Sequence, residues 1–248
     1  MKIAVAGKGG VGKTTFTAWL GDYLARQGED VWLVDADTAL SLGAAIGLRP
    51  ELIPEPLIQD EKLIRERVGS DGFISLNPDV ADLPEQLSIK FHGLNLLVMG
   101  SVAGAGGGCA CGPNSLLKAL LAHLVMERNQ WVLVDLEAGV EHLGRGTAEA
   151  CDGLVVVSEP SRRSLDTAAR VASMARDLGL TRQALVVNRA PEGIKLPKIE
   201  GLPKLAAAIP RLDSLEEQQL KKTTVFGLRE QEAIDGVCAH IVGVLQKQ

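Results

Sequence analysis

The stretch Gly7-Lys8-Gly9-Gly10-Val11-Gly12-Lys13-Thr14 decides the fold of this chain of 248 residues. It has the G-x-x-x-x-G-K-[ST] spacing of a phosphate-binding loop, between a strand pattern at Lys2–Ala6 and a helical pattern at Thr14–Gln27. The glycines let backbone N–H groups surround phosphate oxygens, and the helix adds the positive end of its dipole. Lys13 is expected to reach the terminal phosphates, and the Thr14 hydroxyl to bind Mg²⁺. The expected nucleotide contacts in this segment are Gly9, Gly10, Val11, Gly12, Lys13, Thr14 and Thr15.

Short aliphatic segments alternate with helical patterns along the chain, and they lack the polar alternation of half-exposed strands. This alternation predicts an α/β fold, a doubly wound and mostly parallel sheet with helices on both faces. Strands are expected at Lys2–Ala6, Val31–Asp35, Leu94–Met99, Trp131–Asp135, Gly153–Ser158, Ala184–Asn188 and Leu205–Ile209, and helices at Thr14–Gln27, Asn114–Arg128, Ser161–Leu178 and Asp213–Lys222. We expect a single P-loop ATPase domain over residues 1–248, with an elaborated segment at about 50–93 that holds a helix near Glu55–Val68.

The composition excludes several classes of function. Lys plus Arg number 26 and Asp plus Glu 31, a net charge of −5, which is unsuited to binding DNA or anionic lipid through bulk charge. The first residues lack the apolar length of a signal peptide, and no apolar run approaches a spanning helix. These features predict a cytoplasmic protein with reduced thiols. The last helix carries an apolar stripe at Ile234, Val237, Cys238, Ile241 and Leu245 without a basic opposite face, so we expect it to pack on its own domain.

A second lysine in the phosphate loop, Lys8, indicates which class of phosphate-loop protein this chain resembles. With Lys8, the loop resembles the deviant Walker A loop of the Min-system and partition ATPases, the arsenite and tail-anchor ATPases, and the nitrogenase iron protein. The resemblance implies a nucleotide-dependent homodimer in which Lys8 reaches the partner's nucleotide. It also implies that Asp37 positions the attacking water, that Asp35 lies near the Mg²⁺ shell, and that Asp135 is the Walker B carboxylate.

The same resemblance suggests where the adenine base is bound. Asn188 follows an expected strand and Pro210 follows Ile209, and both match family positions around the base. Glu137 stands in the second switch, where most of the wider family has a small residue or proline. Its role stays open.

Cys109 and Cys111 lie in a loop at residues 104–113, GAGGGCACGP. Glycines on both sides make a poor core segment, and a disulfide across one residue would be strained, so the context favours metal binding. In an extended backbone the two thiols point to one face but leave two of four tetrahedral positions open. The twofold axis of a dimer would supply the other pair, which gives one four-sulfur site for Ni²⁺ or Zn²⁺. We expect Cys151 and Cys238 to be buried structural thiols.

Almost the whole chain resembles the CooC-type ATPases, which mature nickel-containing carbon monoxide dehydrogenases. The carrying segments are KIAVAGKGGVGKTT at residues 2–15, Leu76-Asn77-Pro78, Cys109-x-Cys111 with Asn114-Ser115, and the AGxEHLxRGTA stretch at residues 138–148. The resemblance implies an ATPase that uses ATP/ADP and Mg²⁺, and handles nickel for carbon monoxide dehydrogenase as its client. Glu141, His142 and Arg145 either couple hydrolysis to the metal loop or fix that loop by hydrogen bonds.

Two alternatives remain open from the sequence. The client could be acetyl-CoA synthase, or the four thiols of a dimer could hold an iron–sulfur cluster, as in a reductase resembling the nitrogenase iron protein. The acidic net charge, the terminal helix and the two cysteines argue against a positioning ATPase that acts on DNA or membrane.

Overall fold

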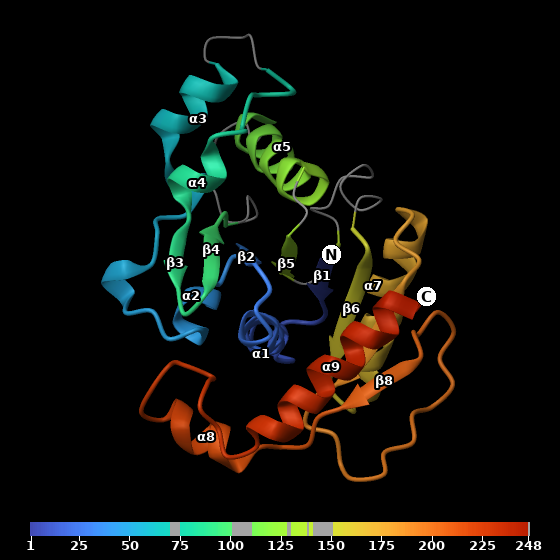
Figure 1. The fold of residues 1–248 in the computed structure, drawn as a ribbon. Helices are drawn as coiled ribbons and strands as arrows, with labels where there is room; N and C mark the ends of the chain where they lie inside the picture. The colour runs from blue at the N-terminus through green and yellow to red at the C-terminus, as the bar shows by residue number, and fades with distance from the viewer. Residues whose placement is uncertain (70–74, 101–110, 128–129, 138, 141–150, 248) are drawn as a thin grey trace.

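A central eight-stranded sheet organises the computed structural model, which describes residues 1–69, 75–100, 111–127, 130–137, 139–140 and 151–247 (Figure 1). The strand order is β3-β4-β2-β5-β1-β6-β7-β8, and every neighbouring pair runs parallel except β3 with β4. The predicted doubly wound, mostly parallel sheet is therefore confirmed. The strands are β1 Lys2–Ala6, β2 Val31–Ala36, β3 Ile89–Phe91, β4 Leu94–Val98, β5 Trp131–Leu136, β6 Gly153–Ser158, β7 Gln183–Val187 and β8 Leu205–Ala208.

Helices cover both faces of this sheet, because successive residues of each buried strand point to opposite sides. In β1, Ile3 and Val5 pack into one apolar cluster, while Ala4 and Ala6 pack into the other. Helices α1 (Lys13–Arg26) and α9 (Gln231–Lys247) bury their apolar residues in the first cluster. Helices α5 (Cys111–Glu127) and α7 (Arg162–Asp177) bury theirs in the second. In Figure 1, α1 and α5 lie on opposite sides of the central strands.

The predicted helix near Glu55–Val68 is shorter in the structure. A 3₁₀ turn, η2 (Leu57–Gln59), precedes α3 (Glu61–Val68). The Asp60 side chain accepts a hydrogen bond from the backbone N–H of Leu63 at 2.9 Å, so it caps α3 and fixes its first residue.

The structure contains several short elements that the sequence patterns did not predict. They are α2 (Leu42–Ala45), α4 (Leu83–Leu87), η1 (Pro50–Leu52) and the edge strand β3. The turn between β3 and β4 is His92-Gly93, with φ values of 50° and 79°. Two successive positive φ values are typical of a type I′ hairpin turn. Glycine favours such φ values, so Gly93 after the alternating segment Ile89-Lys90-Phe91 is the sequence feature that indicates this hairpin.

Helix boundaries differ from the predictions at two sites. Helix α8 spans Asp213–Gln219 and ends before the predicted Lys222. Helix α5 begins at Cys111, earlier than the predicted Asn114, with Pro113 in its first turn, where a missing N–H costs nothing. The backbone at Cys111 is therefore helical and not extended as assumed, while Cys109 and Ala110 lie outside the described residues, so the convergence of the two thiols stays a prediction.

Helix α9 packs on its own sheet as predicted. Ile234, Cys238, Ile241 and Leu245 are at most 4 % exposed, and α9 lies against α1, β7 and β8. The apolar stripe of α9 is thus buried in the core of its own domain. In the part of the chain that the structure describes, none of the helices combines the length and the apolarity that crossing a membrane requires.

Candidate functional site

The phosphate loop connects β1 to α1 at the carboxyl edge of the sheet, and two of its glycines are sterically required. A Cβ on Gly7 would lie 2.1 Å from the carbonyl oxygen of Val157 in β6, and φ is 151°. A Cβ on Gly12 would lie 2.5 Å from the Asn188 amide nitrogen, with φ at 98°. Gly12 provides no side-chain cap for α1. The first N–H groups of α1 therefore remain available to an anion.

Three carboxylates lie beside this loop at the ends of β2 and β5. These neighbouring strands pair in register, with Asp35 opposite Asp135, so two residues a hundred positions apart in the sequence meet at one level of the sheet. The Thr14 hydroxyl donates to Asp135 Oδ2 at 2.6 Å. Lys13 Nζ lies 3.6 Å from Asp37 Oδ2. The loop lysine, the loop threonine and the acidic residues thus form one cluster.

Burial dominates the electrostatics of this cluster. Asp35 and Asp135 are 1 % and 0 % exposed. Loss of water raises the pKa of Asp135 to about 7, although the Thr14 hydrogen bond opposes this, and raises the pKa of Asp35 to about 6. Backbone N–H groups of Leu42 and Asp37 donate to Asp35 at 3.0 and 3.3 Å and partly offset its burial. Both carboxylates would become fully charged when a cation binds between them and the loop.

The cluster fits a magnesium ion. Asp135 Oδ1 is buried and has no hydrogen-bond partner in the described residues, so an oxygen is left for a cation or its water. Mg²⁺ is usually held by one or two protein oxygens together with water and substrate phosphates. Thr14, Asp35 and Asp135 supply hard oxygens of that kind next to the phosphate loop.

Ser41 is a site residue that the sequence reasoning missed. Its hydroxyl donates to Thr14 Oγ1 at 3.3 Å, and it immediately precedes α2, whose first residue, Leu42, donates to Asp35. The segment after Asp37 is therefore tied to both halves of the cluster. Its position after the Asp35-Ala36-Asp37 run was the signal available.

The remaining predicted nucleotide contacts lie around the loop. Lys8 and Thr15 are half-buried, and Gly9 and Gly10 are exposed. Asn188 follows β7 and donates from its side-chain amide to the Val11 carbonyl oxygen at 2.9 Å, so it supports the phosphate loop directly. Exposed Pro210 follows β8, the neighbour of β7. The adenine-binding role of Asn188 and Pro210 stays a prediction.

The predicted metal loop falls largely outside the described residues, as do Cys109, Glu141, His142 and Arg145, and the Cys111 side chain is not described either. Within the described ranges, no group of three or more His, Cys, Asp or Glu side chains could hold a metal ion. Cys151 and Cys238 are buried, as predicted, and burial raises the pKa of Cys151 to about 12. Glu137 is half-buried just after β5.

A loop of this geometry, with its threonine bonded to a buried aspartate, defines a P-loop nucleotide-binding protein. Residues 2–225 match the CobQ/CobB/MinD/ParA nucleotide-binding domain, and the chain belongs to this family. Within it the chain is of the CooC type. It is 45 % identical over 196 residues to the carbon monoxide dehydrogenase accessory protein CooC of Rhodospirillum rubrum. The matched region covers 76 % of this chain and 74 % of that protein.

One further relative and two solved structures are similar to this chain over most of its length. An uncharacterized ATP-binding protein of Methanocaldococcus jannaschii is 39 % identical to this chain over 194 residues. That match covers 76 % of this chain and 75 % of the relative's length. The solved structure of MinD from Aquifex aeolicus, in complex with MinC, has a TM-score of 0.67 at 22 % identity and covers 98 % of this chain and 95 % of that one. MinD from Pyrococcus horikoshii, complexed with Mg-ADP, has a TM-score of 0.64 at 17 % identity and covers 99 % and 94 %. These two similarities establish the fold.

Proposed function

We propose that this chain is a Mg-ATP-dependent maturation factor that handles nickel for carbon monoxide dehydrogenase. The observation that carries the proposal is the phosphate loop, whose Thr14 is bonded to the buried Asp135, in a chain 45 % identical over 196 residues to a carbon monoxide dehydrogenase accessory protein. Nickel is the cargo in this proposal and ATP is the substrate. The reaction takes place in the cytoplasm, where thiols stay reduced.

Hydrolysis in this site would depend on positioning and charge neutralisation. A bound Mg²⁺ would neutralise charge on the β- and γ-phosphates, and Thr14, Asp35 and Asp135 would hold it. Lys13 and the N-terminus of α1 bind the terminal phosphates, and Lys8 of the partner subunit completes the charge at the γ-phosphate. Asp37 orients water for attack on the γ-phosphorus, the bond to the leaving ADP oxygen breaks, and ADP and phosphate are released.

Lys13 and Asp37 form an ion pair, with Lys13 Nζ 3.6 Å from Asp37 Oδ2, and this pair suggests how ATP couples to the rest of the chain. Phosphate oxygens would compete for the Lys13 ammonium and free Asp37 to bind water. Ser41 and Leu42 bond to Thr14 and Asp35, so the segment behind Asp37 would move when a cation draws on those oxygens. The proposed switch therefore begins at this cluster.

The cargo site is part of the same proposal. Cys109 and Cys111 of two chains would form one four-sulfur site at the homodimer interface, and nucleotide and metal would each favour the closed dimer. Metal analysis of the purified dimer should find one ion per dimer. Two ions per dimer, or full affinity in an enforced monomer, would contradict the shared site.

Two variants separate the parts of this mechanism. The double variant Cys109→Ala with Cys111→Ala should lose stoichiometric metal and activation of the dehydrogenase but keep basal ATP hydrolysis. Asp37→Ala should keep the metal and lose hydrolysis, and Cys151→Ala is the matched control for removal of a thiol. Full activation of the dehydrogenase by the double cysteine variant would refute metal carriage. A visible absorption band from anaerobically purified protein would indicate an iron–sulfur cluster instead.

A further inference from the structure

The segment that joins β2 to α2 contains a residue with a strained backbone. Leu40 has a φ of 47°, in the left-handed region that costs free energy for an L-residue other than glycine. Among the described residues, the other non-glycine residues with positive φ are His92, in the β3–β4 turn, and Arg189, which follows Asn188. Strained residues are concentrated in active sites and switch segments, so the place of Leu40 three residues after Asp37 indicates a role in the nucleotide site.

We propose that Leu40 is a positioning residue of the ATPase site. Its left-handed backbone holds Asp37 beside Lys13 in the nucleotide-free chain, and a change of Leu40 to a negative φ releases Asp37 when nucleotide binds. This inference rests on the function proposed above and goes beyond it, because it names the residue at which the switch segment bends. Leu40 acts through Asp37 and makes no contact of its own with the substrate.

Local contacts hold the turn in its strained form. Asp37 Oδ1 accepts a hydrogen bond from the backbone N–H of Ala39 at 2.9 Å, which closes a turn just before Leu40. The Leu40 side chain is half-buried and packs against the apolar cluster that α1 and α9 share. The leucine side chain is therefore anchored in the core while its backbone stays left-handed.

Two further contacts tie the turn to the phosphate loop, and both use groups that the substrate also binds. Lys13 Nζ lies 3.6 Å from Asp37 Oδ2, and Lys13 is the residue expected to bind the terminal phosphates. The Ser41 hydroxyl donates to Thr14 Oγ1 at 3.3 Å, and this oxygen is the one that Thr14 would offer to Mg²⁺. Both contacts would weaken when phosphate and Mg²⁺ bind, which removes the restraint on Leu40.

Both ends of the segment are fixed, so the backbone has to change between them. Strand β2 ends at Ala36, which is paired in register with β5. At the far end, the Ala45 carbonyl oxygen of α2 accepts from the Val225 N–H at 2.9 Å, and the Val225 carbonyl oxygen accepts from the Trp19 indole N–H at 2.8 Å. Helix α2 is thereby anchored to α1. The change is confined to residues 38–41, which are exposed or half-buried and include the strained leucine.

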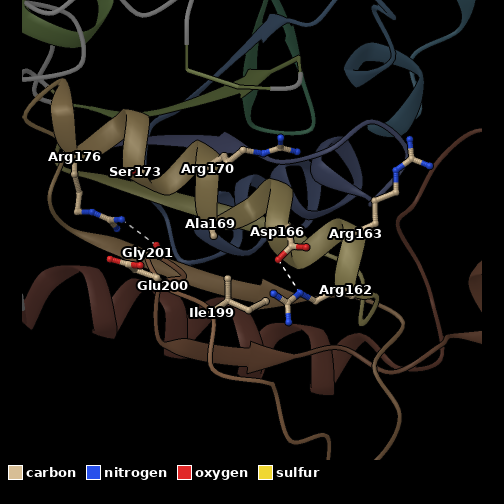
Figure 2. Close-up of a pocket in the computed structure, with 10 residues that line it drawn as sticks. All are labelled: Arg162, Arg163, Asp166, Ala169, Arg170, Ser173, Arg176, Ile199, Glu200 and Gly201. Atoms are coloured by element: carbon tan, nitrogen blue, oxygen red, sulfur yellow. Dashed lines mark hydrogen bonds and ion pairs between the residues drawn. The ribbon is translucent and has the colours of Figure 1, made fainter.

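Helix α7, on the other face of the sheet, is restrained by bonds that are separate from the nucleotide site. Figure 2 shows two of them: Arg162 is bonded to Asp166 at 2.9 Å, and Arg176 donates to the Gly201 carbonyl oxygen at 3.0 Å. Neither bond uses a group of the phosphate loop or of the carboxylate cluster. The backbone of α7 is therefore an internal reference that nucleotide should leave unchanged.

The variants Leu40→Gly and Leu40→Ala separate the backbone effect from the side-chain effect. Both remove the leucine side chain, but only alanine keeps the cost of a left-handed backbone. Calorimetry of the full chain with Mg²⁺ and the non-hydrolysable analogue AMP-PNP should show about 5- to 30-fold weaker binding by Leu40→Gly than by Leu40→Ala, because glycine gains nothing by leaving the left-handed region. This comparison involves folded states alone, so the flexibility of glycine in the unfolded chain does not affect it.

The pair His92→Gly and His92→Ala is the matched control. His92 is exposed and also has a positive φ, so it has the same backbone cost at a place remote from the segment after β2. These two variants should bind Mg–AMP-PNP with equal affinity. In urea unfolding without nucleotide, in EDTA, Leu40→Gly should be at least as stable as Leu40→Ala, although glycine destabilises positions with an ordinary φ. In the wild type, Mg–AMP-PNP should speed hydrogen exchange at Ala39 and leave α7 unchanged.

The possible results distinguish this inference from the function on which it rests. Equal binding of Mg–AMP-PNP by Leu40→Gly and Leu40→Ala would refute the hinge and leave the nucleotide site intact. A nucleotide-free Leu40→Gly that is less stable than Leu40→Ala would show that the position is not strained. A glycine-to-alanine affinity ratio as large for His92 as for Leu40 would refute a specific role of Leu40. Wild-type chain that does not bind Mg–AMP-PNP would overturn the proposed function itself.

Discussion

Replacing Asp135 by asparagine should stabilise the nucleotide-free chain at high pH while it impairs the magnesium site. Asp135 is fully buried, and one of its oxygens has no hydrogen-bond partner in the described residues. Burial raises its pKa from 3.8 to about 7, so the folded state keeps a proton that the unfolded chain releases. The contribution of Asp135 to the free energy of unfolding is therefore most favourable below about pH 4, and this contribution is lost as the pH rises to about 7.

The magnitude follows from these two pKa values. The difference between 3.8 and about 7 corresponds to a loss of about 4 kcal/mol in the free energy of unfolding at pH 8. Asparagine is nearly isosteric, is neutral, and can accept the Thr14 hydrogen bond through its carbonyl oxygen. Its amide N–H group would take the place of the unpartnered oxygen, which costs about 1–3 kcal/mol. The net stabilisation by Asp135→Asn at pH 8 is thus about 1–3 kcal/mol.

Urea unfolding of the nucleotide-free chain in EDTA, at pH 5 and pH 8, measures this difference. At pH 5 the folded chain holds this proton but most of the unfolded chain has released it, so only about 1.5–2 kcal/mol of the loss is present, and the advantage of the variant should be about 2–3 kcal/mol smaller than at pH 8. Calorimetry should also show that the variant loses the Mg²⁺ dependence of ADP binding. Asp177→Asn, at an exposed position, is the control and should change neither quantity. Wild-type stability that is equal at both pH values, or a variant that is less stable at pH 8, would refute the reasoning.

Three further perturbations test the packing around the site. Gly7→Ala should lower the free energy of unfolding by about 3 kcal/mol or more, because its Cβ meets a backbone carbonyl, whereas Gly9→Ala, with no atom within 4 Å, should change it by less than about 0.5 kcal/mol. Urea titration compares the two, and equal losses would contradict the steric argument. Leu245→Ala should lower the free energy of unfolding by about 2–5 kcal/mol if α9 belongs to the core. The control Ala239→Ser, at an exposed position of the same helix, should lower it by less than about 0.5 kcal/mol. A loss below about 1 kcal/mol for Leu245→Ala would argue against that packing. Asn188→Ala removes a hydrogen bond to the phosphate loop and should weaken ADP binding about two- to tenfold by calorimetry, and unchanged affinity would show that the bond does not support the loop.

Much of the fold was predictable because its signals are local. Buried parallel strands are short aliphatic runs, and β1, β6 and the start of β2 fall where the runs predict them. Capping residues fixed other boundaries: Ser161 accepts from the Ser164 N–H at 3.3 Å, so α7 begins one residue after the predicted Ser161. The short helices α2 and α4 were not predicted, because four and five residues are too few to show the 3.6-residue spacing of apolar side chains that indicates a helix.

The candidate site was only partly predictable for a related reason. Lys13, Thr14, Asp35 and Asp135 follow from the loop motif and from acidic residues at strand ends, and the structure brings them together. Ser41 has no motif of its own, and its place beside Thr14 depends on how the chain turns after β2.

The sequence by itself determined the phosphate loop, the alternation of strands and helices, and the apolar stripe of α9, because each is a pattern within a few neighbouring residues. Only the tertiary structure decided that Asp135 is buried beside Thr14, with one oxygen that has no hydrogen-bond partner among the described residues. Burial and pairing depend on which distant segments pack together. The pKa of Asp135 is therefore a property of the fold, not of the residue alone.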